Sequence, residues 1–398
     1  ERMNPVHSDI RGPLFVEAMK RQKQGIDILK LNTGNPATFG FGLPDSIKNA
    51  LMEHMQDGVG YCDFKGMPQA RQAICDYETS KGIKGITPDD VFIGNGVSEV
   101  VSFALTPLLN DGDEVLVPSP SYSLWGNSVY LEDGKPVFYT CDEQANWYPD
   151  IQDIRSKITD KTKAIVIINP NNPTGVLYPK EILLEIIQVA REFGLLIFAD
   201  EIYDRLVMDG KQHISLASLT EDVPVITLNG LSKSHCLCGY RCGWMVISGP
   251  RELTEDYRQG IIQLTSLRLC ANTMAQIVIP AALDDMETPA SMVRPGGRIY
   301  EQREATVREL EKIDGLSFVK NDAAFYVFPK LDVKKFNITN DKQFAHDLLD
   351  ATNILLVPGS GFDWKDPDHF RIVMLPQADI LSDAIRRMGT FLDGYKQK

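Results

Sequence analysis

One lysine near the middle of the chain stands where an apolar segment ends. Residues 225–231 have the composition of a buried strand, and Ser232 and Lys233 follow them directly. Arg241 comes eight residues after the lysine. An amine beside a hydroxyl and a guanidinium suits a Schiff-base lysine next to a phosphate-binding pocket. The alternative is an ordinary loop lysine, because most of the 41 lysine and arginine side chains must be surface charges.

Three other predicted strands also end in polar residues or glycine. They cover residues 91–93, 163–168 and 195–199. Gly96 follows the first strand, Asn172 the second and Asp200 the third. Ligands of open α/β sheets bind beyond the carboxyl ends of the strands, so we expect these three residues to meet Lys233 in one crevice.

The order of helices and strands predicts an α/β protein with two domains. A chain of 398 residues exceeds the usual size of a single hydrophobic core. Apolar helices and strands alternate from about residue 45 to residue 290, which predicts a mainly parallel sheet covered on both faces. A cluster of helix-breaking residues at 294–297 then precedes an α+β pattern. We therefore predict a large domain over 43–293 and a small domain made of 1–42 and 294–398.

Composition and charge argue against several classes of protein. Fifty-four acidic and 41 basic residues give a net charge of −13, which opposes binding to nucleic acid or to anionic membranes. No apolar run approaches the length of a membrane span. Seven cysteines without the spacing of a disulfide framework fit reduced thiols. These features predict a cytoplasmic protein.

Three of the cysteines lie close together in the sequence. Cys236, Cys238 and Cys242 have the spacing C-x-C-x3-C, which could supply thiolates to a metal ion. No histidine pair or second cysteine pair lies nearby to complete a ligand set, and small buried thiols are more common. We therefore predict no metal site.

Five short motifs together have a more specific meaning than any of them alone. They are Asn169-Pro170-Asn171-Asn172-Pro173-Thr174-Gly175, Asp200-Glu201-Ile202-Tyr203, Ser232-Lys233, Gly239-Tyr240-Arg241-Cys242-Gly243-Trp244 and Phe370-Arg371-Ile372. The set resembles the class I aminotransferases, which are pyridoxal-phosphate enzymes of fold type I with a sheet of the seven-stranded type. The resemblance spans essentially the whole chain. Within that family the chain is most similar to bacterial alanine (glutamate–pyruvate) aminotransferases, in segments 9–13, 34–37, 60–63 and 296–298.

The resemblance assigns the residues around the cofactor ring. Lys233 forms the covalent imine with the aldehyde of pyridoxal 5'-phosphate and later carries a proton. Asp200 pairs with the pyridine nitrogen, Tyr203 and Asn172 reach the ring oxygen, and Tyr122 stacks on the ring. Taken singly, Asp200 could equally cap a helix and the tyrosines could be core aromatics. Because burial and nearby positive charge favour a neutral amine, we expect a lowered pKa for Lys233.

The cofactor phosphate requires backbone donors, hydroxyls and a cation. Gly96, Val97 and Ser98 open a predicted helix directly after a strand, so free amides and the helix dipole face the anion. Ser232 and Arg241 add a hydroxyl and a positive charge. These five residues are the predicted phosphate site.

The remaining residues that the resemblance assigns concern the substrate and the partner subunit. Arg371 matches the arginine that binds the substrate α-carboxylate, a task that suits a planar guanidinium. Asn172 also reaches that carboxylate, and Gly34 brings its backbone close to the substrate. Tyr61 matches a tyrosine that touches the phosphate of the neighbouring subunit, which implies a homodimer. No second arginine for the distal carboxylate of glutamate stands out in these motifs.

The predicted reaction is a ping-pong transamination between an L-amino acid and a 2-oxo acid. The resemblance favours L-alanine and 2-oxoglutarate, giving pyruvate and L-glutamate. Aromatic or other neutral amino acids are alternative donors, and a pyridoxal-phosphate β-lyase of the same fold is an alternative activity. A cofactor-sensing regulator would need a basic DNA-binding extension, which the sequence lacks.

Overall fold

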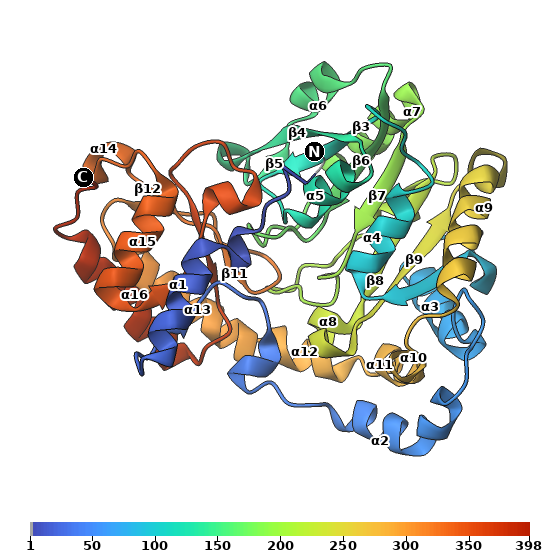
Figure 1. Cartoon of the computed structure of the whole chain (residues 1–398), viewed down its shortest axis with the longest axis horizontal. Coiled ribbons are helices and arrows are strands. Elements are labelled where there is room, and N and C mark those ends of the chain that lie inside the picture. Colours follow the sequence, from blue (N-terminus) through green and yellow to red (C-terminus); the bar gives the residue numbers. More distant parts are fainter. Residues whose placement is uncertain (1–2) are drawn as a thin grey trace.

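Runs of aliphatic and β-branched residues form one large central sheet. The computed structural model describes residues 3–398 and shows this sheet beside a smaller group of helices and short strands (Figure 1). The strands lie in the order β2, β9, β8, β7, β6, β3, β4, β5. Their bounds are β2 Val91–Asn95, β3 Glu114–Ser119, β4 Lys135–Asp142, β5 Tyr148–Pro149, β6 Thr162–Ile168, β7 Leu196–Asp200, β8 Val225–Gly230 and β9 Cys242–Ser248. The expected seven strands are joined by an eighth, the two-residue β5.

The register of the parallel strands brings their polar ends together. β8, β7, β6, β3 and β4 are parallel, whereas β9 runs antiparallel between β2 and β8. Asp200 at the end of β7 pairs with Ile168 of β6 and Leu228 of β8. Residues that follow these strands therefore share one edge of the sheet, as the sequence predicts.

Helices cover both faces of the sheet because alternate strand residues are apolar on each side. In β6, Val166 packs in one buried cluster with residues of α4, α5 and α9, and Ile165 packs in another with residues of α6 and α7. The helices around the sheet are α2 Asp45–His54, α3 Pro68–Ser80, α4 Val97–Leu105, α5 Leu124–Leu131, α6 Ile151–Lys157, α7 Lys180–Phe193, α8 Leu231–Ser234, α9 Arg251–Arg268, α10 Thr273–Ile277, α11 Ile279–Asp284 and α12 Glu287–Val293.

A second core combines residues from both ends of the chain. Leu31 is buried with Leu348, Ile372 and Ile385, and the N-terminal α1 lies against the C-terminal helices in Figure 1. Its helices are α1 Pro13–Lys23, α13 Arg298–Leu310, α14 Val333–Phe336, α15 Asp341–Thr352 and α16 Ala378–Leu392. Its strands are β1 Leu29–Lys30, β10 Leu316–Ser317, β11 Tyr326–Val327, β12 Lys330–Leu331, β13 Ile354–Leu355, β14 Val357–Pro358 and β15 Phe370–Val373. This core supports the predicted two-domain division, whose boundaries stay a prediction.

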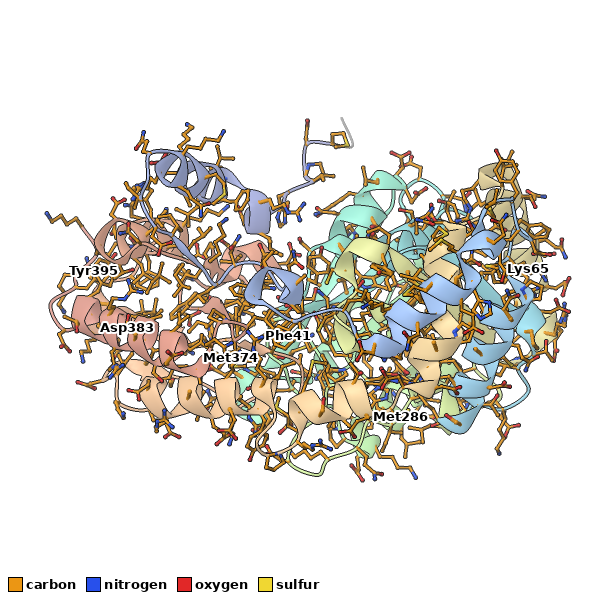
Figure 2. The ribbon with its side chains drawn as sticks, turned by 90° about the horizontal axis from the view of Figure 1, so that it is seen from below. Phe41, Lys65, Met286, Met374, Asp383 and Tyr395 are labelled. Atoms are coloured by element: carbon orange, nitrogen blue, oxygen red, sulfur yellow. The ribbon has the colours of Figure 1, made fainter. Side chains whose placement is uncertain are left out.

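A smaller apolar cluster joins the two parts of the molecule. It packs Tyr203 from the sheet side against Phe325, Tyr326 and Val373 from the second core. Phe41, which packs on the same cluster, lies in the middle of Figure 2, between Tyr395 at one end of the molecule and Lys65 at the other. Within residues 3–398 no helix is both long and apolar enough to cross a membrane.

Candidate active site

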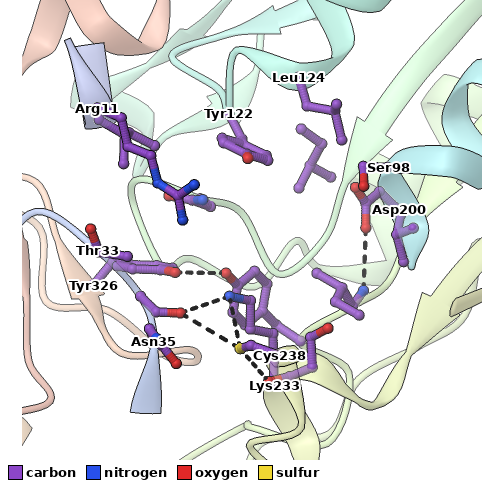
Figure 3. A pocket seen from close by; sticks show the side chains of 18 of the residues that line it. Arg11, Thr33, Asn35, Ser98, Tyr122, Leu124, Asp200, Lys233, Cys238 and Tyr326 are labelled. Carbon is purple, nitrogen blue, oxygen red and sulfur yellow. Dashed lines mark hydrogen bonds between the residues drawn. The ribbon is translucent and has the colours of Figure 1, made fainter. Parts of the chain in front are cut away.

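A cavity of about 790 Å³ opens where the sheet edge meets the second core. Its walls come from β7, α4 and α8 on the sheet side, and from β11, β15 and the N-terminal segment on the other side (Figure 3). Most of the predicted site residues line it, although they are far apart in sequence. These are Gly34, Val97, Ser98, Tyr122, Asn172, Asp200, Tyr203, Ser232, Lys233, Arg241 and Arg371.

Lys233 lies in the short helix α8 and not at the end of the strand itself. Gly230 ends β8, and a Cβ there would come within 2.5 Å of the Cys242 carbonyl oxygen, so only glycine allows α8 to start at this point. The Lys233 ammonium is half-buried and donates a hydrogen bond of 2.9 Å to the carbonyl oxygen of Gly34 (Figure 3). The reactive amine is therefore held at the boundary between the two parts of the molecule.

The protein's own side chains raise the pKa of Lys233, so the expectation of a lowered pKa is wrong. Burial alone would lower this pKa. The side chains of Tyr326, Cys238 and Tyr122, which become negative on ionisation, favour the ammonium form and outweigh burial. Arg241, the cation expected to act here, has its guanidinium directed to Ser98 instead. The ammonium must therefore lose a proton before the nitrogen can act as a nucleophile.

Asp200 is a buried carboxylate, and no cationic group of residues 3–398 lies within hydrogen-bonding distance of it. It is 6% exposed, and one of its oxygens accepts a hydrogen bond of 3.1 Å from the Trp125 indole. The backbone N–H of Ile202 donates a second, longer bond of 3.4 Å. Burial raises the pKa of this carboxyl group to about 6. A buried carboxylate at a cavity wall is suited to pair with a cationic ring nitrogen.

The start of α4 forms an anion site with Arg241. Gly96 precedes the helix with φ +86°, and a Cβ at this position would lie 2.3 Å from the Arg241 guanidinium. Arg241 donates to the Ser98 hydroxyl at 3.0 Å and to the Cys238 carbonyl oxygen at 3.0 Å. Free amides at the start of a nine-residue helix, a hydroxyl and a guanidinium therefore converge, as predicted for a phosphate. Gly96 does not itself line the cavity, but its missing side chain leaves room for the Arg241 guanidinium.

Arg371 is a second anion site, at the opposite wall. It is 1% exposed, donates to the Asn172 side-chain oxygen at 2.9 Å, and donates to the backbone oxygen of Asn32. The rings of Tyr326 and Phe362 each lie 4.6 Å from its guanidinium carbon. Within residues 3–398 no carboxylate lies within 4.0 Å of it, and its Nε has no partner. Burial lowers the pKa of this guanidinium, and a bound carboxylate would offset that cost.

Two tyrosine hydroxyls meet beside Gly34. The hydroxyls of Tyr203 and Tyr326 are 2.8 Å apart, and a Cβ on Gly34 would lie 2.2 Å from the Tyr326 hydroxyl oxygen. Gly34 is therefore needed for the approach of its backbone to this pair. Tyr122 is exposed to the cavity, as a ring-stacking residue must be.

Sequence reasoning missed several residues of the cavity. The clearest are Arg11, Thr33, Asn35, Cys238 and Tyr326. Thr33 and Asn35 flank the predicted Gly34, so proximity could have found them. Tyr326 lies in the apolar run 323–328 and has the pattern of a core aromatic. Arg11 had one signal, a charged side chain directly before Gly-Pro in a segment used for the resemblance.

Tyr61 lies outside this cavity. It is 83% exposed and lines a separate shallow hollow with residues 58–60 and 270–273. Its assignment to the site of a neighbouring subunit stays a prediction.

The clustered cysteines have three different environments. The Cys236 sulfur lies 3.9 Å from the Met292 sulfur, Cys242 is buried in an apolar cluster, and Cys238 faces the cavity. Their spacing in sequence does not gather the three thiols at one point, as the metal interpretation requires. Among residues 3–398 the one group arranged to bind an ion is Glu201, Asp204 and His213, and Lys81 already pairs with both carboxylates.

The cavity combines a primary amine, a buried carboxyl group and two anion sites. This set can bind a molecule that carries a phosphate and a basic ring, present an amine to it, and hold a carboxylate opposite. The structure thus brings the predicted chemistry together without assigning a substrate.

Comparison with known proteins identifies the family. The model for the aminotransferases of class I and II matches residues 26–385. The glutamate-pyruvate aminotransferase AlaA of Haemophilus influenzae is 50% identical over all of this chain and 98% of that protein. The crystal structure of an aminotransferase from Escherichia coli superposes with a TM-score of 0.98 at 47% identity, covering 100% of this chain and 98% of that one. An alanine aminotransferase structure from Pyrococcus furiosus gives 0.93 at 41% identity, covering 99% of each chain. The chain is therefore a member of the class I and II aminotransferases, with the α/β architecture of fold type I.

Proposed function

We propose that this aminotransferase transfers the amino group of L-alanine to 2-oxoglutarate, giving pyruvate and L-glutamate by a ping-pong sequence. The observation that carries the proposal is a sequence identity of 50% over the whole chain to a relative named glutamate-pyruvate aminotransferase. The amine of Lys233 between two anion sites supports it. The second of these sites, at Arg371, suits the α-carboxylate that both amino acids share.

The residues at the sheet edge fit pyridoxal 5'-phosphate. The start of α4, Ser98, Ser232 and Arg241 would hold its phosphate, and Asp200 would hold its ring nitrogen. Two features support the fit. The absence of a side chain at Gly96 leaves room for the Arg241 guanidinium beside the start of α4, and Asp200 is buried with no cationic partner among residues 3–398. When bound, this cofactor supplies an aldehyde for the amine and a ring that accepts electrons from the substrate Cα.

The chain's own residues then have separate tasks. Arg371, held by Asn172 and by the Asn32 carbonyl, fixes the substrate carboxylate and so sets the direction of its Cα–H bond. Lys233 moves the Cα proton once its nitrogen is free. The Gly34 carbonyl, 2.9 Å from that nitrogen, keeps it between the two walls. Tyr203 and Tyr122 would touch the cofactor ring.

The proposal includes a homodimer in which Tyr61 completes the partner's phosphate site. Large apolar side chains are exposed in the two segments that line the hollow at Tyr61 or close to those segments in the sequence, as expected of a surface that is covered. They are Val59, Leu267, Leu269 and Met274. Seven unpaired cysteines support a cytoplasmic location.

Mixing two inactive variants tests the shared site. Tyr61→Ala and Lys233→Ala should each be impaired alone. In a mixed dimer one site carries both changes and the other carries neither, so activity should reappear. No recovery in a dimer of proven mixed composition would show that Tyr61 does not act across the interface.

Steady-state kinetics with purified enzyme test the reaction itself. L-alanine with 2-oxoglutarate should have a higher kcat/KM than aromatic or other neutral donors, and pyruvate and glutamate should form in equal amounts. Ammonia and pyruvate released from a cysteine-type substrate, which carries a leaving group on Cβ, in the absence of an oxo acid would instead indicate a β-lyase. A higher kcat/KM for an aromatic donor would reject alanine as the preferred substrate.

A further inference from the structure

Tyr326 is a buried residue of the cavity that contacts both sides of it. It lies in β11, is 2% exposed, and belongs to the apolar cluster that joins the sheet to the second core. Its hydroxyl oxygen is 2.8 Å from that of Tyr203, on the sheet side (Figure 3). The centre of its ring lies 4.6 Å from the guanidinium carbon of Arg371, on the other side. One side chain thus connects a residue that would touch the cofactor ring with the residue that would bind the substrate carboxylate.

The hydroxyls of Tyr203 and Tyr326 share one hydrogen bond, so one of their two protons is left for another acceptor. Within residues 3–398 neither hydroxyl has a second hydrogen-bond partner, and both residues line the cavity. The second proton is therefore available to a molecule in the cavity. It comes from Tyr203 if Tyr326 is the donor of the pair, and from Tyr326 if the direction is reversed.

Arg371 favours Tyr326 as the donor of this pair. In a low-dielectric interior, a cation against the face of a phenol ring polarises its O–H bond and strengthens it as a donor. No acidic group of residues 3–398 pairs with Arg371, so its charge acts on the ring in full. Burial and the neighbouring Tyr326 phenol raise the pKa of Tyr203, which therefore keeps its proton. That proton is then the one available to the cavity.

The Tyr326 hydroxyl also lies close to the segment that holds the reactive amine. A Cβ on Gly34 would lie 2.2 Å from the Tyr326 hydroxyl oxygen, and the Gly34 carbonyl oxygen accepts from Lys233 at 2.9 Å. Burial lowers the pKa of Lys233, and the phenol of Tyr326 has the largest opposing effect. A small change at this hydroxyl is therefore felt by the amine and by Tyr203 together.

We propose that Tyr326 is a positioning residue with two separate tasks. Its hydroxyl donates to Tyr203 and so leaves the Tyr203 proton for the oxygen of the cofactor ring, and its ring holds Arg371 in place for the substrate carboxylate. The inference rests on the proposed function and deepens it by naming the residue that connects the cofactor ring to the carboxylate site. Two hydroxyls in series donate more strongly than one, because buried hydrogen bonds polarise one another. A stronger donor stabilises negative charge on the ring oxygen, so the imine nitrogen of Lys233 binds its proton less tightly.

A spectral titration of the holoenzyme tests the hydroxyl without turnover. Tyr326→Phe removes one oxygen and keeps the ring, so the pKa of the imine, read from its visible absorbance against pH, should rise by about 0.3 to 1. Tyr203→Phe removes the direct donor and should raise the same pKa further. A lower imine pKa in Tyr326→Phe would show that Tyr203 is the donor of the pair, and an unchanged one that the pair does not act on the ring. Either result would overturn the role of the hydroxyl.

The matched control is a buried tyrosine outside the cavity. The Tyr139 hydroxyl donates to the Val166 carbonyl oxygen at 2.7 Å, and Tyr139 is fully buried and does not line the cavity. Tyr139→Phe therefore removes one buried hydroxyl and one hydrogen bond, as Tyr326→Phe does. It should leave the imine pKa unchanged, and a rise equal to that of Tyr326→Phe would mean that a general loss of packing causes both.

Binding of a simple carboxylate tests the ring. Propanoate has one carboxylate and no amino group, so its Kd for the holoenzyme reports on Arg371 and not on the reaction. Tyr326→Phe keeps the ring and should change this Kd less than about twofold. Tyr326→Leu removes the ring and should raise the Kd about 3- to 10-fold, the size of a cation–π contact. Equal Kd values for the Phe and Leu variants would overturn the role of the ring.

Neither measurement depends on the amino donor. If the wild-type enzyme prefers a donor other than alanine, the proposed function fails, and the imine pKa and the propanoate Kd still decide the role of Tyr326. If the enzyme uses alanine and Tyr326→Phe leaves the imine pKa unchanged, the role of the Tyr326 hydroxyl fails alone.

Discussion

The two walls of the cavity are built in different ways. The lysine wall consists of Lys233, Asp200, Ser98 and Arg241, which lie in or next to the strands of one sheet and the helices that follow them. The arginine wall consists of Arg371, Asn32 and Arg11, which come from both ends of the chain. Hydrogen bonds within the sheet fix the first wall, whereas the second depends on segments more than 300 residues apart meeting in one place.

The difference separates the chemistry from the choice of substrate. Groups of the lysine wall act on every substrate, because they would hold the cofactor and move the proton. Arg371 of the arginine wall would contact the substrate α-carboxylate and take no part in moving the proton. Changes in the lysine wall should therefore lower kcat, whereas changes at Arg371 should act mostly through substrate binding.

The largest effect is expected in the lysine wall. Lys233→Ala removes the amine and the proton carrier, so activity with every substrate should fall by about 10⁴-fold or more. The visible absorbance of the imine should also disappear from the purified protein. An imine band that persists in this variant would show that another lysine carries the cofactor.

Arg371 should show the next largest effect. Arg371→Met should lower kcat/KM about 10²- to 10³-fold for alanine and glutamate alike, because both lose the guanidinium that binds the α-carboxylate. The same change removes a buried charge that has no acidic partner among residues 3–398, so urea unfolding should show equal or greater stability. A loss confined to glutamate would contradict the assignment of Arg371 to the α-carboxylate, which both amino acids carry.

Sequence reasoning located the lysine wall better than the arginine wall. Lys233, Asp200 and Gly96 follow predicted strands, and parallel strands necessarily bring such residues to one edge. Arg371 was found through its motif. Arg11 was missed because its place in the cavity depends on the hydrogen bond from Asn32 to the neighbouring Ile10, which no local pattern predicts. The raised pKa of Lys233 depends on Tyr326, another residue brought close only by folding.

Asp200 gives a pH-dependent effect of intermediate size. Its folded-state pKa of about 6 exceeds the ordinary value of 3.8, so the folded protein holds this proton more tightly than the unfolded chain. Stability of the cofactor-free protein should therefore fall as pH rises from about 4 to about 6 and stay lower above that. Asp200→Asn removes the penalty, which is about 3 kcal/mol for two pKa units, and should stabilise the protein at pH 8 but not at pH 4. Urea midpoints of both proteins at pH 4 and at pH 8 measure this. A gain in stability over wild type that is no larger at pH 8 than at pH 4 would contradict it.

The smallest effect should come from the hydrogen bond between Asn32 and the N-terminal segment. Asn32→Ala keeps the backbone oxygen that accepts from Arg371 and removes the bond to the Ile10 carbonyl. The N-terminal segment that lines the cavity is then less well fixed, and kcat/KM for alanine and glutamate should fall about 3- to 10-fold. An unchanged kcat/KM for both would show that this hydrogen bond does not position the site.

The most direct test of the account is a single half-reaction without an acceptor. Wild-type holoenzyme mixed with excess L-alanine should release one pyruvate per active site, lose the imine absorbance and stop. Addition of 2-oxoglutarate should restore the absorbance and form one glutamate per site. Pyruvate that continues to accumulate without an oxo acid, or an absorbance that 2-oxoglutarate does not restore, would contradict transamination at Lys233.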